Sequence, residues 1–242
     1  KTDVGASQEW LKAAILFGLA AYFAFNITNG NITNYVNERF SWLSYVAVLI
    51  FVALGVAVAI GAYRRHQAPR GYSHTPVTWS ILGIVAIPLV LGLAIPSRPL
   101  GADAVNGNIS VQVASVDVAS ALAKDPLTRN ILDWLRAFAR DTSDPTSFDG
   151  QPADLIGFVY REPGYPEDHF MVARFTMSCC VADAGAIGLP VYVQNADEFT
   201  DGEWVRVQGQ FLTGQFDDRR MPVLQAQMIE ITDQPEHPYL YP

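Results

Sequence analysis

Three long apolar runs in the first hundred residues constrain this 242-residue chain more than any other feature. They extend from Leu11 to Ile27, from Leu43 to Tyr63 and from Val77 to Ile95, and Lys12 is the only Asp, Glu, Lys, Arg or His within them. At 1.5 Å of rise per residue, runs of 17 to 21 residues match a bilayer core about 30 Å thick. Buried core helices are the alternative, but three such runs in series favour three transmembrane helices, at 11–27, 43–63 and 77–95.

The loops between these runs predict their orientation. The loop 64–76 carries three arginines, whereas the loop 28–41 carries one basic and one acidic residue. Loops rich in Lys and Arg stay in the cytoplasm, so the N-terminus and loop 64–76 are expected there. We therefore expect a multi-pass protein of a bacterial plasma membrane, with everything after residue 98 outside.

The charges divide the chain into two parts. Residues 1–100 hold seven Lys and Arg against three Asp and Glu, whereas residues 101–242 hold nine against 21 and so carry a net charge of -12. We expect a helical membrane domain at 1–100, followed by an extracytoplasmic domain at 101–242 that is long enough for its own core. A strongly acidic domain repels phosphate, so nucleic acid is not expected as a partner.

A change of hydrophobic period predicts that the second domain is mainly β. Behind Asp125 as N-cap, Pro126–Arg140 repeats apolar residues every three or four positions and is expected to be one amphipathic helix. Residues 108–118 suggest a strand or extended arm, and 141–150 a loop. Alternating segments then predict five strands, at 153–162, 169–178, 189–195, 203–211 and 222–232. This pattern favours an OB-fold-like five-stranded barrel with one or two helices, and a β-sandwich stays possible.

The only cysteines, Cys179 and Cys180, are adjacent at the end of the second predicted strand. A disulfide between them is strained, because adjacent Cα atoms lie about 3.8 Å apart and bridged ones usually about 4.4 Å or more. A second interpretation is a site for zinc or another thiophilic ion, formed by Cys179, Cys180, Asp183 and His169. It requires the backbone to leave strand geometry, since neighbouring strand side chains point to opposite faces. The third interpretation is that one thiol packs in the core and the other lines the turn.

The residues around this pair carry a family resemblance. The sequences CCVADA at 179–184 and GLPV at 188–191 resemble the signature of the YcgQ-like family of bacterial membrane proteins, and the similarity covers most of the chain. Further matches are GFVY at 157–160, EWVRVQG at 203–209, PSRPL at 96–100 and PYLY at 238–241. The resemblance implies a membrane segment, a small extracytoplasmic β domain and an accessory role beside a larger predicted permease. It also strengthens the ligand roles of Cys179, Cys180 and Asp183.

The sequence leads to one main functional hypothesis and two alternatives. The predicted helices contain no ionisable residue in their interiors, so they are not expected to conduct or pump alone. We expect a non-catalytic accessory subunit that contacts lipid and a predicted permease, with an external β domain that binds a metal or metalloid. The alternatives are a structural subunit of another large assembly, such as an electron-transfer or photosynthetic complex, and an extracytoplasmic thiol redox protein. No motif of a serine hydrolase, phosphate loop or glycosidase stands out, so enzymatic activity is not expected.

Overall fold

The computed structural model describes residues 3–67, 79–105, 107, 109–112, 118–140 and 144–242. The chain divides into two compact units, Lys1–Arg98 and Pro99–Pro242. Most of loop 64–76, which carries the orientation prediction, lies outside the described residues, as do positions 77 and 78 of the third predicted span and most of the arm predicted at 108–118.

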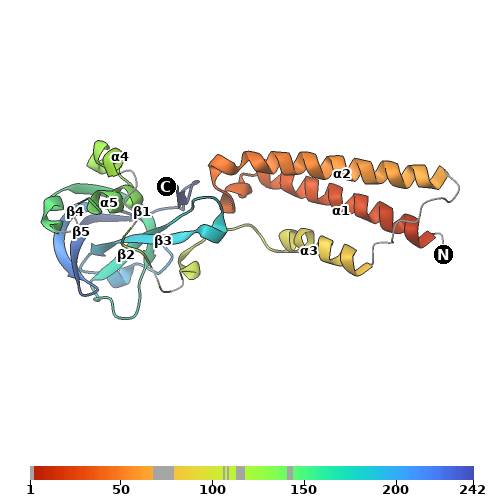
Figure 1. Ribbon diagram of the computed structural model, residues 1–242. Helices are drawn as coiled ribbons and strands as arrows, with labels where there is room; N and C mark the ends of the chain where they lie inside the picture. Colours follow the sequence, from red (N-terminus) through yellow and green to blue (C-terminus); the bar gives the residue numbers. More distant parts are fainter. Residues whose placement is uncertain (1–2, 68–78, 106, 108, 113–117, 141–143) are drawn as a thin grey trace. The chain divides into compact units, whose positions relative to one another are not determined.

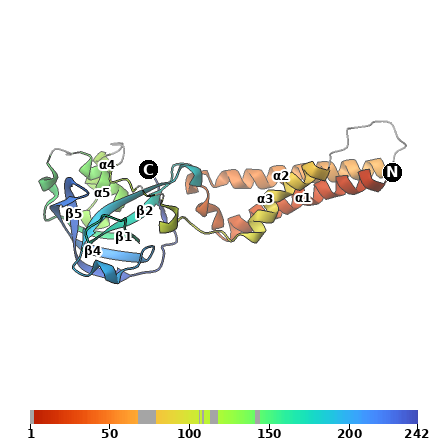
Figure 2. The same ribbon diagram turned by 90° about the horizontal axis from the view of Figure 1, so that it is seen from below.

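The first unit is helical. Helices α1 and α2 lie side by side and α3 packs against α1 (Figures 1 and 2). Their bounds are Asp3–Thr28 for α1, Trp42–Gln67 for α2 and Trp79–Ala94 for α3, with short 3-10 turns η1 (Asn31–Asn34) and η2 (Glu38–Phe40) between the first two. Two stretches, Ser7–Thr28 and Glu38–Arg64, are long and apolar enough to cross a membrane, whereas Trp79–Ala94 is also apolar but has only 16 residues.

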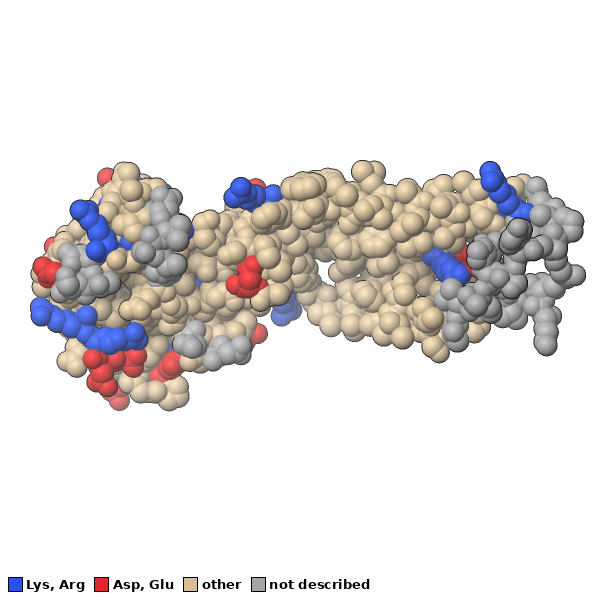
Figure 3. All heavy atoms as spheres, in the orientation of Figure 1, with Lys and Arg blue, Asp and Glu red and all other residues tan. Residues whose placement is uncertain are grey.

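The two longer helices expose apolar surface. Only 22% of the apolar window in the first stretch and 11% in the second is buried, unlike the core helices of a soluble protein. Figure 3 shows uncharged residues over the helices of this unit, with charged side chains gathered towards their ends. Leu49 on α2 and Leu93 on α3 are 69% and 73% exposed. Such surface needs lipid or another apolar partner around it.

Small residues allow the helices of this unit to approach each other. A Cβ atom added to Gly92 on α3 would lie 2.5 Å from the ring of Tyr22 on α1, and one on Gly18 would lie 2.9 Å from Leu89. On α2, Gly55 faces the ring of Phe17 in the same way. These glycines leave room for large side chains of the facing helix, the close approach that small residues permit in membrane helices.

The second unit is built on a six-stranded sheet with the order β1-β4-β5-β3-β2-β6. Its strands are β1 (Pro152–Tyr160), β2 (His169–Thr176), β3 (Gly185–Tyr192), β4 (Trp204–Phe216), β5 (Arg219–Ile231) and β6 (Tyr239–Leu240). β1 also pairs with β2, so the first five strands form a closed ring. The β3–β5 and β2–β6 pairs are parallel and the others antiparallel. The five predicted strands are all present, and β6 was not predicted.

The predicted helix over Pro126–Arg140 is wrong at its start. Pro126–Thr128 forms a 3-10 turn, η4, capped by Asp125, and α5 begins only at Ile131 and ends at Phe138. The reason is a second cap: the Asn130 side chain accepts from the backbone N–H of Asp133, whose carboxylate accepts from the N–H of Asn130. This reciprocal capping box sets the first turn of α5.

α5 supplies the helical part of the core. Trp134 is fully buried and packs on Phe211 of β4 with ring centroids 4.7 Å apart. The predicted arm makes one isolated parallel bridge, Ser110 with Ile187, and the chain then forms α4 (Val118–Ala123) where the end of that arm was expected. The remaining short turns are η3 (Ala102–Ala104), η5 (Pro145–Phe148) within the predicted loop, η6 (Val181–Asp183) and η7 (Ala196–Glu198).

The C-terminal strand covers part of β2. β1 pairs with residues 171–173 of β2, whereas Tyr239 and Leu240 of β6 pair with residues 175 and 176 on that strand. The backbone N–H of Met177 donates to the carbonyl oxygen of Leu240 at 3.0 Å. The Tyr239 hydroxyl accepts from the backbone N–H of Leu100 at 2.8 Å, which ties β6 to the start of this unit.

Candidate metal centre in the loop after β2

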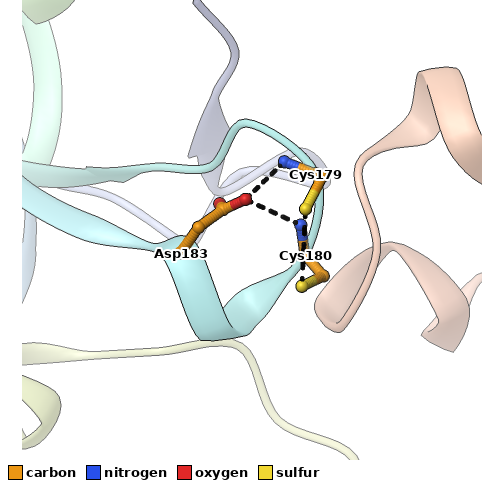
Figure 4. A group of neighbouring side chains, drawn as sticks. All are labelled: Cys179, Cys180 and Asp183. Atoms are coloured by element: carbon orange, nitrogen blue, oxygen red, sulfur yellow. Dashed lines mark hydrogen bonds between the residues drawn. The ribbon is translucent and has the colours of Figure 1, made fainter.

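The loop between β2 and β3 brings two thiols and a carboxylate together. The potential ligand atoms of Cys179, Cys180 and Asp183 all lie within 4.8 Å of one another (Figure 4). β2 ends at Thr176, and the 3-10 turn η6 follows Cys180. The backbone has therefore left strand geometry before the first cysteine, as the metal-site interpretation requires.

Asp183 holds this loop through the backbone. One carboxylate oxygen, Oδ1, accepts from the N–H of Ser178 at 2.9 Å. The other, Oδ2, accepts from the N–H of Cys179 at 2.8 Å and from that of Cys180 at 3.4 Å. The N–H of Asp183 in turn donates to the Cys180 carbonyl at 2.9 Å. A single side chain thus fixes the conformation that brings both cysteines to one side of it.

The two thiols are close but separate. Their Sγ atoms lie 3.6 Å apart, and both cysteines are free. A disulfide needs about 2.05 Å between sulfurs, so the strained bridge considered from the sequence is not formed. Cys179 is exposed and Cys180 is partly exposed, so neither thiol packs as a buried core residue.

Hydrogen bonds keep the Cys179 thiol protonated. A hydrogen bond to the Asp183 carboxylate, followed by one to Cys180, raises the pKa of the Cys179 thiol to about 12. The same thiol bond and the backbone donors lower the pKa of Asp183. Because the thiolate is the nucleophilic form, this environment disfavours Cys179 as a redox nucleophile at neutral pH. A cation held between these groups would replace the thiol proton.

His169 does not join this group, which corrects the four-residue ligand set expected from the sequence. It is the first residue of β2, and the cysteines follow the end of that strand. At about 3.3 Å per residue, the eight residues of β2 place the two ends roughly 25 Å apart. Instead, Nδ1 of His169 lies 2.6 Å from Oδ1 of Asp168, and its ring packs against Tyr192 and Phe216.

A second feature, which the sequence did not indicate, is an open hollow beside the β1–β2 loop. It is lined by residues 161–168 together with Gln194, Asn195 and Asp197. Burial, together with the nearby charge of Glu162, raises the pKa of Tyr165 to about 12, so this ring stays neutral. The acidic side chains of the hollow come from two separate loops, and alternation within a strand gives no signal for such a site.

Family models match both units. The model described as the DUF1980 N-terminal domain matches residues 11–109, and the one described as the DUF1980 C-terminal domain matches residues 117–242. The chain belongs to the DUF1980 family. The candidate centre lies in the C-terminal domain of this family, and the YcgQ-like resemblance is confirmed.

Individual DUF1980-like relatives are similar along almost their whole length. UPF0703 protein YcgQ of Bacillus subtilis is 20% identical over 280 residues, covering 94% of this chain and 97% of the relative. A Streptococcus mutans protein, named as a candidate subunit of a two-component membrane permease complex, is 22% identical over 264 residues, covering 92% and 97%. Among solved structures, a small single-stranded DNA-binding protein of Streptomyces coelicolor aligns with 34% of this chain and 93% of its own, at 14% identity and a TM-score of 0.24.

Proposed function

We propose that this chain is a non-catalytic accessory subunit of a membrane permease complex. The observation that carries the proposal is the apolar surface of two long helices, which are only 22% and 11% buried and therefore need lipid or a membrane partner. The name of the Streptococcus mutans relative supports a permease complex as that partner. The uncharged interiors of these helices support an accessory role, since transport pathways usually carry ionisable residues.

The proposal includes three membrane spans, with the N-terminus and loop 64–76 in the cytoplasm and the β unit outside. α3 is the shortest α-helix of the first unit, and its 16 residues extend about 24 Å. A few flanking residues complete a span of about 30 Å, and local thinning of the bilayer accommodates a short helix at modest cost. The arginines of loop 64–76 support the orientation.

The β unit is proposed to be an OB-fold-like barrel that contacts the partner and holds a thiophilic ion. The ring of pairings β1-β4-β5-β3-β2-β1, with its one parallel pair between β3 and β5, supports this barrel. The grouping of Cys179, Cys180 and Asp183 within 4.8 Å supports the ion site, because two thiols and a carboxylate suit zinc and related ions.

Purification of the full chain in a mild detergent tests the assignment. A tag at the C-terminus should bring down a many-helix protein of the predicted permease type, identified by mass spectrometry. An identically tagged, unrelated membrane protein controls for nonspecific capture. Recovery of the chain as a stable lone monomer would count against the proposal. Capture of an electron-transfer or photosynthetic assembly would support the structural-subunit alternative instead.

A further inference from the structure

The spacing of the two sulfurs discriminates among thiophilic ions. The Sγ atoms of Cys179 and Cys180 lie 3.6 Å apart. An ion bonded to both at the zinc–sulfur distance of about 2.3 Å has a sulfur–metal–sulfur angle of about 103°, close to the tetrahedral angle of about 109°. Linear coordination at the same bond length needs sulfurs about 4.6 Å apart. The observed pair therefore fits a tetrahedral divalent cation of the zinc class better than an ion that prefers two opposed ligands.

Asp183 is positioned to complete a set of three ligands. A carboxylate has about four lone-pair sites, and the backbone N–H groups of residues 178, 179 and 180 occupy three of them. The Cys179 thiol donates to the same carboxylate, and the loss of its proton on loading frees this fourth site for an ion. Both sulfurs lie within 4.8 Å of a carboxylate oxygen. The backbone bonds also hold the carboxylate in place before an ion arrives, as partners of metal ligands commonly do.

These three ligands fill three of the four coordination positions of a tetrahedral ion and leave the fourth open. Structural zinc sites are closed by four protein ligands, whereas sites that exchange ligands keep a position open. Among the described residues, Cys179, Cys180 and Asp183 form the group, and Cys179 and Asp183 are exposed to solvent. The fourth ligand can therefore come from water or from another molecule. Exposure and an open position are the properties of a site that gives up its ion.

We infer that this loop is a hand-over site for a zinc-class divalent cation, and that such a cation is the substrate of the membrane complex. This inference rests on the proposed function. Loading breaks two S–H bonds and forms two sulfur–metal bonds, while two protons leave to solvent and no electron is transferred. Unloading to the partner reverses these steps, with the open position admitting the first incoming ligand.

Metal binding is tested on the reduced full chain in detergent, titrated with Zn²⁺ against a chromophoric chelator. One ion per chain should bind with release of two protons. Cys179→Ser and Cys180→Ser should each weaken binding by more than about 100-fold, and Asp183→Asn by about 10- to 100-fold. Asp217→Asn, which removes a carboxylate from the β4–β5 turn, is the matched control and should stay within about twofold. Unchanged affinity in both cysteine variants would overturn the site.

The open position is tested with Co²⁺, which reports its ligands through its visible spectrum. Added imidazole should shift the spectrum of the cobalt-loaded chain while two thiolate ligands remain. A spectrum that does not respond to imidazole would indicate a closed site and would overturn the hand-over role. The double variant Cys179→Ser with Cys180→Ser should lack the thiolate charge-transfer band altogether.

The substrate assignment is tested in liposomes that contain the chain with its co-purified membrane partner. Radioactive zinc should cross with the wild-type chain, and its flux should fall to the level of empty liposomes with the double cysteine variant. If the partner is present and neither chain gives zinc flux above that of empty liposomes, the substrate assignment fails and the proposed function stands. Equal flux above that level with both chains would overturn the hand-over role of the loop. If the chain binds zinc but brings down no membrane partner, the proposed function fails, and the substrate assignment with it.

Discussion

The carboxylate of Asp183 accepts the backbone N–H of Cys179 at 2.8 Å and also a hydrogen bond from the Cys179 thiol. The same side chain therefore shapes the loop and controls the protonation of the residue it shapes. Asp183→Asn removes the charge and keeps only one of the two oxygens that accept the backbone N–H groups of the loop.

The hydrogen bond to Asp183 is the largest cause that raises the pKa of the Cys179 thiol. In the metal-free Cys180→Ser background, Asp183→Asn should therefore lower this pKa towards its ordinary value. Alkylation by iodoacetamide at pH 8 should then become at least about tenfold faster, because only the thiolate reacts. Peptide mass spectrometry follows the modification at Cys179. Equal rates with and without the carboxylate would contradict the assigned cause of the shift.

His169→Gln should leave the zinc affinity of the full chain within about twofold of wild type, because His169 lies at the far end of β2 from the cysteines. Competition with a chromophoric chelator provides the measurement. A loss of tenfold or more would mean that this imidazole does reach the ion, and the four-residue site expected from the sequence would be restored.

Gly92→Leu should destabilise the packing of α3 on α1 by about 1–3 kcal/mol, since a side chain at this position meets the ring of Tyr22 at 2.5 Å. Gly83→Leu is the control on the same helix, because no atom lies within 4 Å of a Cβ at Gly83. Hydrogen exchange of α3 in detergent compares them. Similar exchange in both variants would show that the contact with Tyr22 does not hold the helix.

Asn130→Ala should destabilise α5 by about 1 kcal/mol, because it removes the side-chain acceptor of the capping box. Asn195→Ala serves as the control, since Asn195 precedes η7 without a side-chain cap bond. Hydrogen exchange at the first turn of α5 is the readout. If both substitutions have the same effect there, the cap does not set the start of this helix.

Acidification should weaken the β1–β4 pair. Arg206 donates from Nε to Oδ1 of Asp154 at 2.8 Å, and this bond holds the Asp154 pKa below its ordinary value. A depressed carboxyl pKa stabilises the fold above the unfolded value of about 3.9 and loses that contribution as pH falls through the folded value. Asp154→Asn should therefore reduce the dependence of unfolding on pH below about 4. If unfolding depends on pH below about 4 in the same way in both proteins, the Asp154 carboxylate makes no such contribution.

The sequence predicted those features that have a local signal. Period-two alternation located all five longer strands, and uncharged length located α1 and α2. β4 continues past its predicted end at Phe211 to Phe216, because the hairpin turn lies at Asp217 and Asp218, whose φ angles are 51° and 57°. Two aspartates in left-handed conformation are a rarer turn signal than the Gly214 that precedes them.

Features that depend on pairing partners were harder to predict. β6 has two residues, too few for any alternation, and exists because β2 offers it an edge. At the candidate site, adjacency brought Cys179 and Cys180 together and the turn added Asp183, all within five residues. His169 was expected as a ligand from the chemistry of its side chain alone. It is not one of the group, because the length of β2 separates it from the cysteines.

β1 and β6 share one edge of β2, and together they protect this edge when many copies lie close to one another. β1 covers residues 171–173 and β6 covers 175 and 176, so the short strand completes the protection that ring closure begins. Copies anchored in one bilayer meet at far higher local concentration than molecules in free solution. An uncovered strand edge would invite neighbouring copies to join their sheets. The two-residue strand thus keeps the β units of neighbouring copies separate and disfavours their edge-to-edge association.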